Sequence, residues 1–239
     1  MARLPRVVVA EVPHHITQRG NARQTILATD ADRLAYLELL RHYAGLHELS
    51  LLGYCLMSNH VHLVAIPRAV ESLAQTLKYA HGRYASYWNA CHASSGHVWQ
   101  GRFYSCPLDE SHVWEALRYT ELNPVRAGMV TAAEQWPWSS AGAHAGLAQA
   151  GVSQDPLLAM ELWRTRWTVS EWCEYLAAGA SPTVVASLRR ATHTGRPLGA
   201  EGFVTALEKT TLRLLAPQKR GRHRRGTGPT LSPKLTFAA

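Results

Sequence analysis

Two histidines separated by one residue, His60 and His62, are the side chains in this sequence best suited to hold a metal ion. They lie in an apolar run, residues 51–66, which predicts two strands joined by a tight turn at Ser58-Asn59. Side chains two apart in a strand point to one face, about 6–7 Å apart at their bases. Two neutral imidazoles on a rigid strand chelate a divalent cation well. The alternative for an isolated pair is an inert, hydrogen-bonded structural role.

Tyr119 and Asn123 lie four residues apart in a predicted helix and therefore share a face. Tyrosine can act as a covalent nucleophile, and the asparagine carbonyl oxygen suits a hard divalent cation. Taken alone the pair indicates little, because a helix tyrosine is more often a half-buried packing residue. It gains meaning from the histidine pair upstream and the basic segment downstream.

The elements that position these residues follow from apolar periodicity and cap residues. We expect a strand at residues 13–19, a helix capped by Asp30, the two strands around the histidine pair, and a helix over residues 72–87. A strand at 102–106 and a helix from the cap Asp109 to residue 122 follow, and Asn123-Pro124 ends that helix. The order β-α-β-β-α-β-α predicts an α+β fold with a ferredoxin-like, or RRM-like, antiparallel sheet and an added tyrosine-bearing helix.

The rest of the chain predicts a small helical region and a tail. Residues 133–168 look irregular, and helices are expected at 169–177, 182–191 and 200–215. From residue 217 onward the composition is rich in Gly, Pro and Lys/Arg, which is typical of disorder. We therefore predict three parts: residues 1–140 with the site, the helical region 141–216, and the basic tail 217–239.

Charge is concentrated near the C-terminus. Residues 181–239 hold 11 Lys/Arg and 2 Asp/Glu, whereas residues 1–180 hold 14 and 15. A nearly neutral body with a basic end favours a polyanion partner, nucleic acid before an anionic membrane surface. No apolar span of about 20 residues exists, so no bilayer crossing is expected. The four cysteines lack metal-site spacing, which predicts reduced, mostly buried thiols in a cytoplasmic protein.

Four segments in order carry a resemblance to a known family: Pro13-His14-His15-Ile16-Thr17-Gln18-Arg19-Gly20-Asn21, Asn59-His60-Val61-His62, Val98-Trp99-Gln100-Gly101-Arg102-Phe103, and Arg118-Tyr119-Thr120-Glu121-Leu122-Asn123-Pro124-Val125-Arg126-Ala127-Gly128. Together they resemble the REP-associated tyrosine transposases, a branch of the HUH single-tyrosine transposases. The loop at residues 194–199 and the basic tail resemble longer members of that branch. One departure is Ser58, where proline is frequent in the family.

The resemblance implies a mechanism and a partner. His60, His62 and Asn123 would hold one Mg²⁺ or Mn²⁺, and Tyr119 would attack the scissile phosphate to form a 5′-phosphotyrosine. The substrate would be single-stranded DNA folded as a hairpin, such as a REP-like palindrome, which is cleaved and rejoined. Residues 1–140 would be the catalytic domain. Both a monomer and a homodimer remain open, because dimeric relatives can exchange the tyrosine helix.

Basic residues outside the histidine pair are candidates for DNA contacts, with solvated surface roles as the alternative. Arg19 and Arg23 follow the first strand, and Arg102 stands between a glycine and an aromatic residue. The tail offers non-specific phosphate attraction; its candidates are Lys219, Arg220, Arg222, Arg224 and Arg225. His14 and His15 face opposite ways in a strand, so at most one approaches the His60 face, and neither is predicted as a ligand.

Two competing functions share this fold. One is a domesticated protein that binds hairpin DNA without turnover; the complete set of metal and nucleophile candidates argues against it. The other is an RRM-like RNA binder, which would expose aromatic side chains on its central strands. The central strand here carries histidines instead, so this function ranks last.

Overall fold

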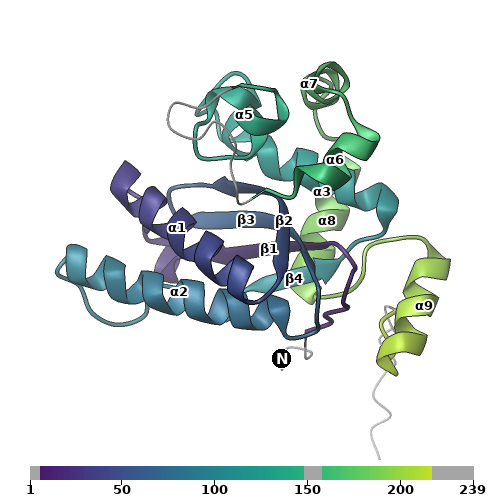
Figure 1. Ribbon diagram of the computed structural model, residues 1–239, viewed down its shortest axis with the longest axis horizontal. Helices are drawn as coiled ribbons and strands as arrows, with labels where there is room; N and C mark the ends of the chain where they lie inside the picture. The colour runs from purple at the N-terminus through teal and green to yellow at the C-terminus, as the bar shows by residue number, and fades with distance from the viewer. Residues whose placement is uncertain (1–5, 148–157, 217–239) are drawn as a thin grey trace, which may run out of the picture.

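The computed structural model describes residues 6–147 and 158–216, and a four-stranded antiparallel sheet forms its centre (Figure 1). The strands are β1 (His14–Arg19), β2 (Leu49–Leu56), β3 (His60–Pro67) and β4 (Tyr104–Pro107). Their spatial order is β2-β3-β1-β4, with every neighbouring pair antiparallel. This is the ferredoxin-like order that the sequence predicts. The residues that connect β2 and β3 include the expected Ser58-Asn59 turn, whose Ser58 carbonyl accepts from the amides of Ile26 and Leu27.

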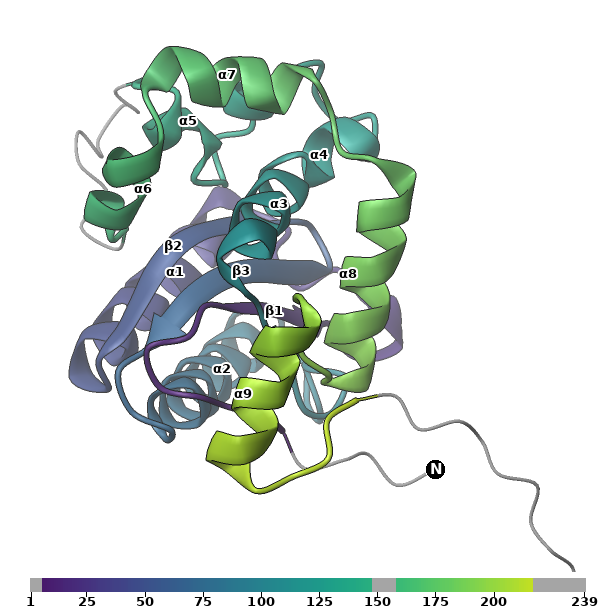
Figure 2. The same cartoon turned by 90° about the vertical axis from the view of Figure 1, so that its right-hand side faces the viewer.

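Two helices, α1 (Asp30–Leu46) and α2 (Ser72–Cys91), cover one face of the sheet (Figures 1 and 2). Ile16 and Leu63 from the central strands pack there against Tyr36 and Leu77. The cap of α1 differs from the expectation. Thr29, not Asp30, is the N-cap, because its hydroxyl accepts from the Asp32 amide while the Asp32 carboxylate accepts from the Thr29 amide.

The opposite face is covered by α3 (Glu110–Glu121) and α8 (Pro182–Thr194), as Figure 2 shows. Asp109 caps α3 as expected, since its carboxylate accepts from the His112 amide. The helix ends before Pro124, and a short helix, α4 (Asn123–Arg126), begins there at once with proline near its start. The chain therefore turns immediately after the tyrosine helix and keeps Asn123 beside it.

The stretch expected to be irregular contains short elements: the 3-10 turn η2 (Ala133–Gln135), α5 (Ala141–His144) and α6 (Met160–Arg166). They were missed because elements this short carry little periodicity, and burial of Trp163 against Trp172 stabilises α6 through tertiary packing. All three later helices exist as expected. The bounds of α7 (Val169–Ala177) are those predicted, α8 runs three residues further, and α9 (Glu201–Thr211) ends four residues earlier than predicted.

The second hydrophobic core runs across the predicted boundary at residue 140. It contains Leu52 and Val64 from the sheet, Leu117 from α3, and Trp172 and Leu188 from the C-terminal helices. The three-part division thus stays a prediction, and the tail 217–239 lies outside the described residues. Because both sides contribute to this core, α3 is packed between the sheet and the C-terminal helices.

All four cysteines are free thiols, as expected, but only Cys55 and Cys106 are buried; Cys91 is exposed and Cys173 is half-buried. Within residues 6–147 and 158–216, no helix combines the length and the apolar character that crossing a bilayer requires.

Candidate active site

The histidine pair lies on the sheet face beneath α3. His60 is paired with Arg19 and His62 with Thr17 in the register of β1 and β3, so all four side chains share that face. His15, two residues before Thr17, joins them. The rings of His60 and His62 are 5.0 Å apart between centroids and nearly perpendicular. Strand alternation therefore produces the predicted side-by-side arrangement.

Helix α3 places Tyr119 against His62 and His15. Its ring centroid is 5.5 Å from that of His62 and 5.7 Å from that of His15, and the residue is 4% exposed. Asn123 is also buried, at 7% exposure. A pocket of about 570 Å³ is lined by Tyr119, His60, His62 and Asn123 together. The structure thus brings together, within one chain, the four residues that the sequence singles out as nucleophile and metal ligands.

The imidazoles of this face are neutral near pH 7. Burial, with Arg19 and Arg126 nearby, lowers the pKa of His60 to about 4. Burial also holds the pKa of His62 well below its usual range, and neighbouring charges add to the effect. The pKa of His15 is lowered to about 3 by burial and by Arg126. Neutral imidazoles keep a lone pair available for a cation.

Hydrogen bonds fix the available nitrogen of His60 and relate that of His62 to the tautomer of His15. His60 Nδ1 lies 2.7 Å from Asn59 Oδ1, an acceptor, so it carries the proton and leaves Nε2 with the lone pair. His62 Nδ1 lies 3.1 Å from His15 Nε2, and His15 Nδ1 lies 2.7 Å from the Thr192 hydroxyl. If each ring donates along this chain towards Thr192, His62 also presents Nε2 to the pocket. Ligand histidines typically have such an outer partner on the second nitrogen.

Asn123, the first residue of α4, is oriented by carbonyl groups at the end of α3, and its side-chain oxygen is shared with Arg126. Its Nδ2 donates to the carbonyls of Tyr119 and Thr120, both at 3.1 Å. Its Oδ1 accepts from Arg126 Nη2 at 2.6 Å. An amide oxygen has two lone pairs, so one remains for a metal. In the described part of the chain no cluster of three His, Cys, Asp or Glu could hold an ion.

Two imidazoles and one amide oxygen form a nitrogen and oxygen donor set that could hold one divalent cation and leave positions open for other ligands. The Arg126 guanidinium is a competing cation at the same oxygen. Its Nη1 also donates to the Tyr119 carbonyl at 2.8 Å, and its Cζ lies 4.1 Å from the centroid of the Tyr119 ring. Arg126 therefore braces the tyrosine from one side.

Sequence reasoning missed four residues of this site. Arg126 follows Tyr119 by seven residues, which is two helical turns, and this spacing could have predicted that the two side chains lie close together. The sequence does not decide whether His14 or His15 faces the histidine pair. The register places His15 beside His62, while His14 bonds the Val12 carbonyl through Nδ1. Arg189 and Thr192 come from α8, and Arg189 Nε donates to the Tyr119 hydroxyl at 3.1 Å. No local pattern relates α8 to residues some 70 positions earlier.

The predicted DNA contacts fall in different places. Arg19 is exposed and lines the pocket. Arg23 is exposed in the 3-10 turn η1 (Asn21–Arg23), and its carbonyl accepts from Asn59 Nδ2 at 3.2 Å, beside the histidine turn. Arg102 is exposed after Gly101 but does not line the pocket. Five predicted contacts lie outside the described residues: Lys219, Arg220, Arg222, Arg224 and Arg225.

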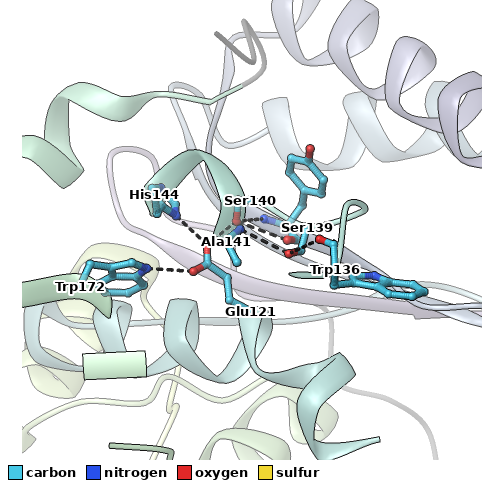
Figure 3. Close-up of polar contacts among 8 residues, drawn as sticks. Glu121, Trp136, Ser139, Ser140, Ala141, His144 and Trp172 are labelled. Atoms are coloured by element: carbon cyan, nitrogen blue, oxygen red, sulfur yellow. Dashed lines mark hydrogen bonds and ion pairs between the residues drawn. The ribbon is translucent and has the colours of Figure 1, made fainter. Parts of the chain in front are cut away.

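A buried polar cluster holds α3 from behind (Figure 3). Glu121 is fully buried; its Oε1 accepts from Ser140 and from His144 Nδ1 at 2.6 Å, and its Oε2 accepts from Trp172 Nε1 at 2.9 Å. Ser140 also accepts from the Tyr54 amide of β2 at 3.0 Å. The helix that carries the tyrosine is therefore tied to β2, α5 and α7 two residues beyond Tyr119.

The sheet face argues against RNA recognition of the RRM type. Its central strands carry His15, Thr17, His60 and His62 where that fold would expose stacking aromatics. Helices α3 and α8 also pack on this face. The site is a pocket beneath a helix, not an open platform.

Comparison with known proteins agrees with this geometry. Residues 8–123 match the family model described as "Transposase IS200 like". Among solved structures, the chain is similar to a REP-associated tyrosine transposase bound to a REP hairpin, at 15% identity and a TM-score of 0.54, covering 64% of this chain and 91% of that chain. It also resembles a putative transposase from Deinococcus radiodurans R1 at 20% identity, covering 50% of this chain and 96% of that one, with a TM-score of 0.35, too low to define a shared fold. No curated protein matches the chain.

The chain is therefore similar, over residues 8–123, to the IS200-like transposases, a class of enzymes that cleave and transfer DNA. Within that class, its fold is that of a REP-associated tyrosine transposase, the branch whose motifs the sequence resembles.

Proposed function

We propose that this protein cleaves and rejoins single-stranded hairpin DNA through a 5′-phosphotyrosine on Tyr119. The observation that supports the proposal is the convergence of Tyr119 with His60, His62 and Asn123 in one pocket of a single chain. A tyrosine packed only for stability has no need of paired neutral imidazoles beneath its ring. The solved relative is bound to a REP hairpin, which supports a hairpin as the substrate here as well.

In the proposed reaction the Tyr119 oxygen bonds to phosphorus, and the bond from phosphorus to the 3′ oxygen breaks. The phenolic proton leaves to water in the pocket, and the released 3′ oxygen takes up a proton. Attack by a different 3′ hydroxyl reverses the step and joins a new strand. His60, His62 and Asn123 would hold Mg²⁺ or Mn²⁺, which supplies charge stabilisation at the scissile phosphate. Arg19, Arg23 and Arg102 would bind the DNA backbone around the pocket.

The test is covalent capture on denaturing gels. Wild-type protein with a hairpin oligonucleotide and Mn²⁺ should give a protein–DNA adduct, and Tyr119→Phe should give none while binding the hairpin nearly as well. His60→Ala and His62→Ala should each abolish the adduct, and Asn123→Ala should be milder, because water can replace one neutral oxygen ligand. An adduct from Tyr119→Phe would move the nucleophile elsewhere, and full activity in EDTA would remove the metal.

Binding without turnover is the second candidate, and one observation favours it. The Arg126 guanidinium occupies Asn123 Oδ1 at 2.6 Å, where a metal would need the remaining lone pair. This function predicts hairpin binding with no adduct in either Mg²⁺ or Mn²⁺, and the same gels distinguish it.

A further inference from the structure

Helix α8 lies beyond the segment that matches the transposase family, yet it contacts the proposed nucleophile. Building on the proposed function, we propose that Arg189 is a catalytic residue, which holds the Tyr119 hydroxyl and then binds the phosphate oxygens that the reaction charges. Its Nε donates to Tyr119 Oη at 3.1 Å, and its Cζ lies 5.7 Å from the ring centroid.

The guanidinium groups of Arg126 and Arg189, both beside Tyr119, differ in how many of their nitrogens already donate a hydrogen bond. Arg126 already uses both terminal nitrogens, one on the Tyr119 carbonyl and one on Asn123 Oδ1. Arg189 uses Nε alone; within the described residues its terminal nitrogens have no hydrogen-bond partner, and the side chain lines the pocket. Arg126 is therefore a brace for the tyrosine helix, whereas Arg189 has donors to offer a substrate.

A phosphate is the ligand that those donors fit. Guanidinium binds phosphate oxygens through two parallel N–H groups. A phosphorus bonded to Tyr119 Oη carries its non-bridging oxygens within reach of a side chain whose Nε already lies 3.1 Å from that atom. Charge on these oxygens increases as the bond forms, so donors fixed beforehand stabilise the transition state more than the free substrate. Arg189 acts in this step by donating hydrogen bonds and neither gives nor takes a proton.

The position of α8 is fixed by packing, which holds the backbone at Arg189, while the exposed side chain is held by its bond to Tyr119. Leu188 and Ala191, on either side of it in sequence, are buried in the second hydrophobic core. Thr192 bonds His15 Nδ1 at 2.7 Å and lies 3.3 Å from Cys106 Sγ on β4. Gly195 ends the helix with φ of 74°, the left-handed conformation that glycine adopts without strain. The helix backbone should therefore remain in place when the Arg189 head group is removed.

The chain offers a matched control in Arg190, which is exposed and is the next residue of the same helix. Arg189→Gln and Arg190→Gln remove the same charge, so long-range attraction for DNA changes equally in both. We would measure the single-turnover rate of adduct formation at saturating hairpin and Mn²⁺, and hairpin affinity by anisotropy without metal. Arg189→Gln should slow adduct formation about 100-fold, with affinity changed no more than in the control. Arg190→Gln should react nearly as fast as wild type.

Chemical rescue separates catalysis from structure. Guanidinium ion added to Arg189→Ala should restore part of the rate, and Arg189→Lys should retain more activity than Arg189→Ala. Equal rates for Arg189→Gln and Arg190→Gln would overturn the proposal while leaving the phosphotyrosine mechanism intact. A slow Arg189→Ala that neither guanidinium nor lysine improves would assign Arg189 a structural role and also overturn it. A wild-type protein that forms no adduct would refute the proposed function itself.

Discussion

The buried carboxylate of Glu121 should be a main determinant of the stability of the tyrosine helix. Glu121→Ala removes the acceptor of three hydrogen bonds and leaves the donors of Ser140, His144 and Trp172 in a site with no exposed surface at the carboxylate residue. An unsatisfied buried donor costs about 1–3 kcal/mol, and breaking a buried charged contact costs about 3–5 kcal/mol in total. Because these terms overlap, we expect a loss of about 3–5 kcal/mol in the free energy of unfolding.

Glu121→Gln tests the same contacts more gently. The glutamine side chain keeps one acceptor oxygen but replaces the other carboxylate oxygen with an NH₂ donor. That donor faces a hydrogen-bond donor of the cluster. We expect a loss of about 1–3 kcal/mol. Glu110→Ala, an exposed position in the first turn of α3, is the control on the same helix and should cost less than about 1 kcal/mol.

Urea unfolding followed by far-UV circular dichroism gives these differences directly, provided that the denaturant dependence of the unfolding free energy is unchanged. Amide hydrogen exchange should show the loss of protection first in α3, α5 and α7, which the cluster joins. A Glu121→Ala protein within about 1 kcal/mol of wild type, or no less stable than Glu110→Ala, would refute this account of how α3 is held.

Three further outcomes follow from burial, hydrogen bonding and charge. Burial lowers the pKa of His14 to about 4 and that of His81 to about 3, so below about pH 6.5 the unfolded chain binds protons that the folded chain does not. The free energy of unfolding should therefore fall by about 2 kcal/mol per histidine between pH 7 and pH 5. A free energy of unfolding in urea that does not change over this pH range would contradict the expectation. Thr192→Val removes the hydroxyl that fixes His15 and through it His62; Mn²⁺ affinity by calorimetry should fall about 10-fold or more, and unchanged affinity would disprove the link. Deleting residues 217–239 removes six Lys/Arg and no acidic residue, so hairpin binding across a salt series should weaken with a smaller salt slope and the same preference for matched over scrambled hairpins; loss of that preference would make the tail a reader of sequence.

Local patterns were sufficient for the sheet and for half of the site. The two-residue period of a strand placed His60 and His62 on one face, and the four-residue spacing of a helix placed Tyr119 beside Asn123. Both periods are properties of the backbone alone, so they predict which side chains share a face without knowledge of the fold. Their convergence in one pocket required more, namely the order of strands and the face on which α3 packs, which the ferredoxin-like topology supplied.

The rest of the site depends on packing between distant segments, which no local pattern encodes. His15 approaches His62 only because of the register of β1 against β3. A shift of one residue would have placed His14 on the face of His60 and His62 instead. Arg189 and Thr192 reach the site because buried Leu188 and Trp172 fasten the C-terminal helices to the same core as the sheet. The predicted catalytic domain ends at residue 140. It therefore omits the side chain that bonds the proposed nucleophile, the hydroxyl that bonds His15 beside the proposed metal ligand His62, and one donor of the cluster behind α3. The functional unit therefore has to be defined by contacts to Tyr119, and those contacts extend through α8.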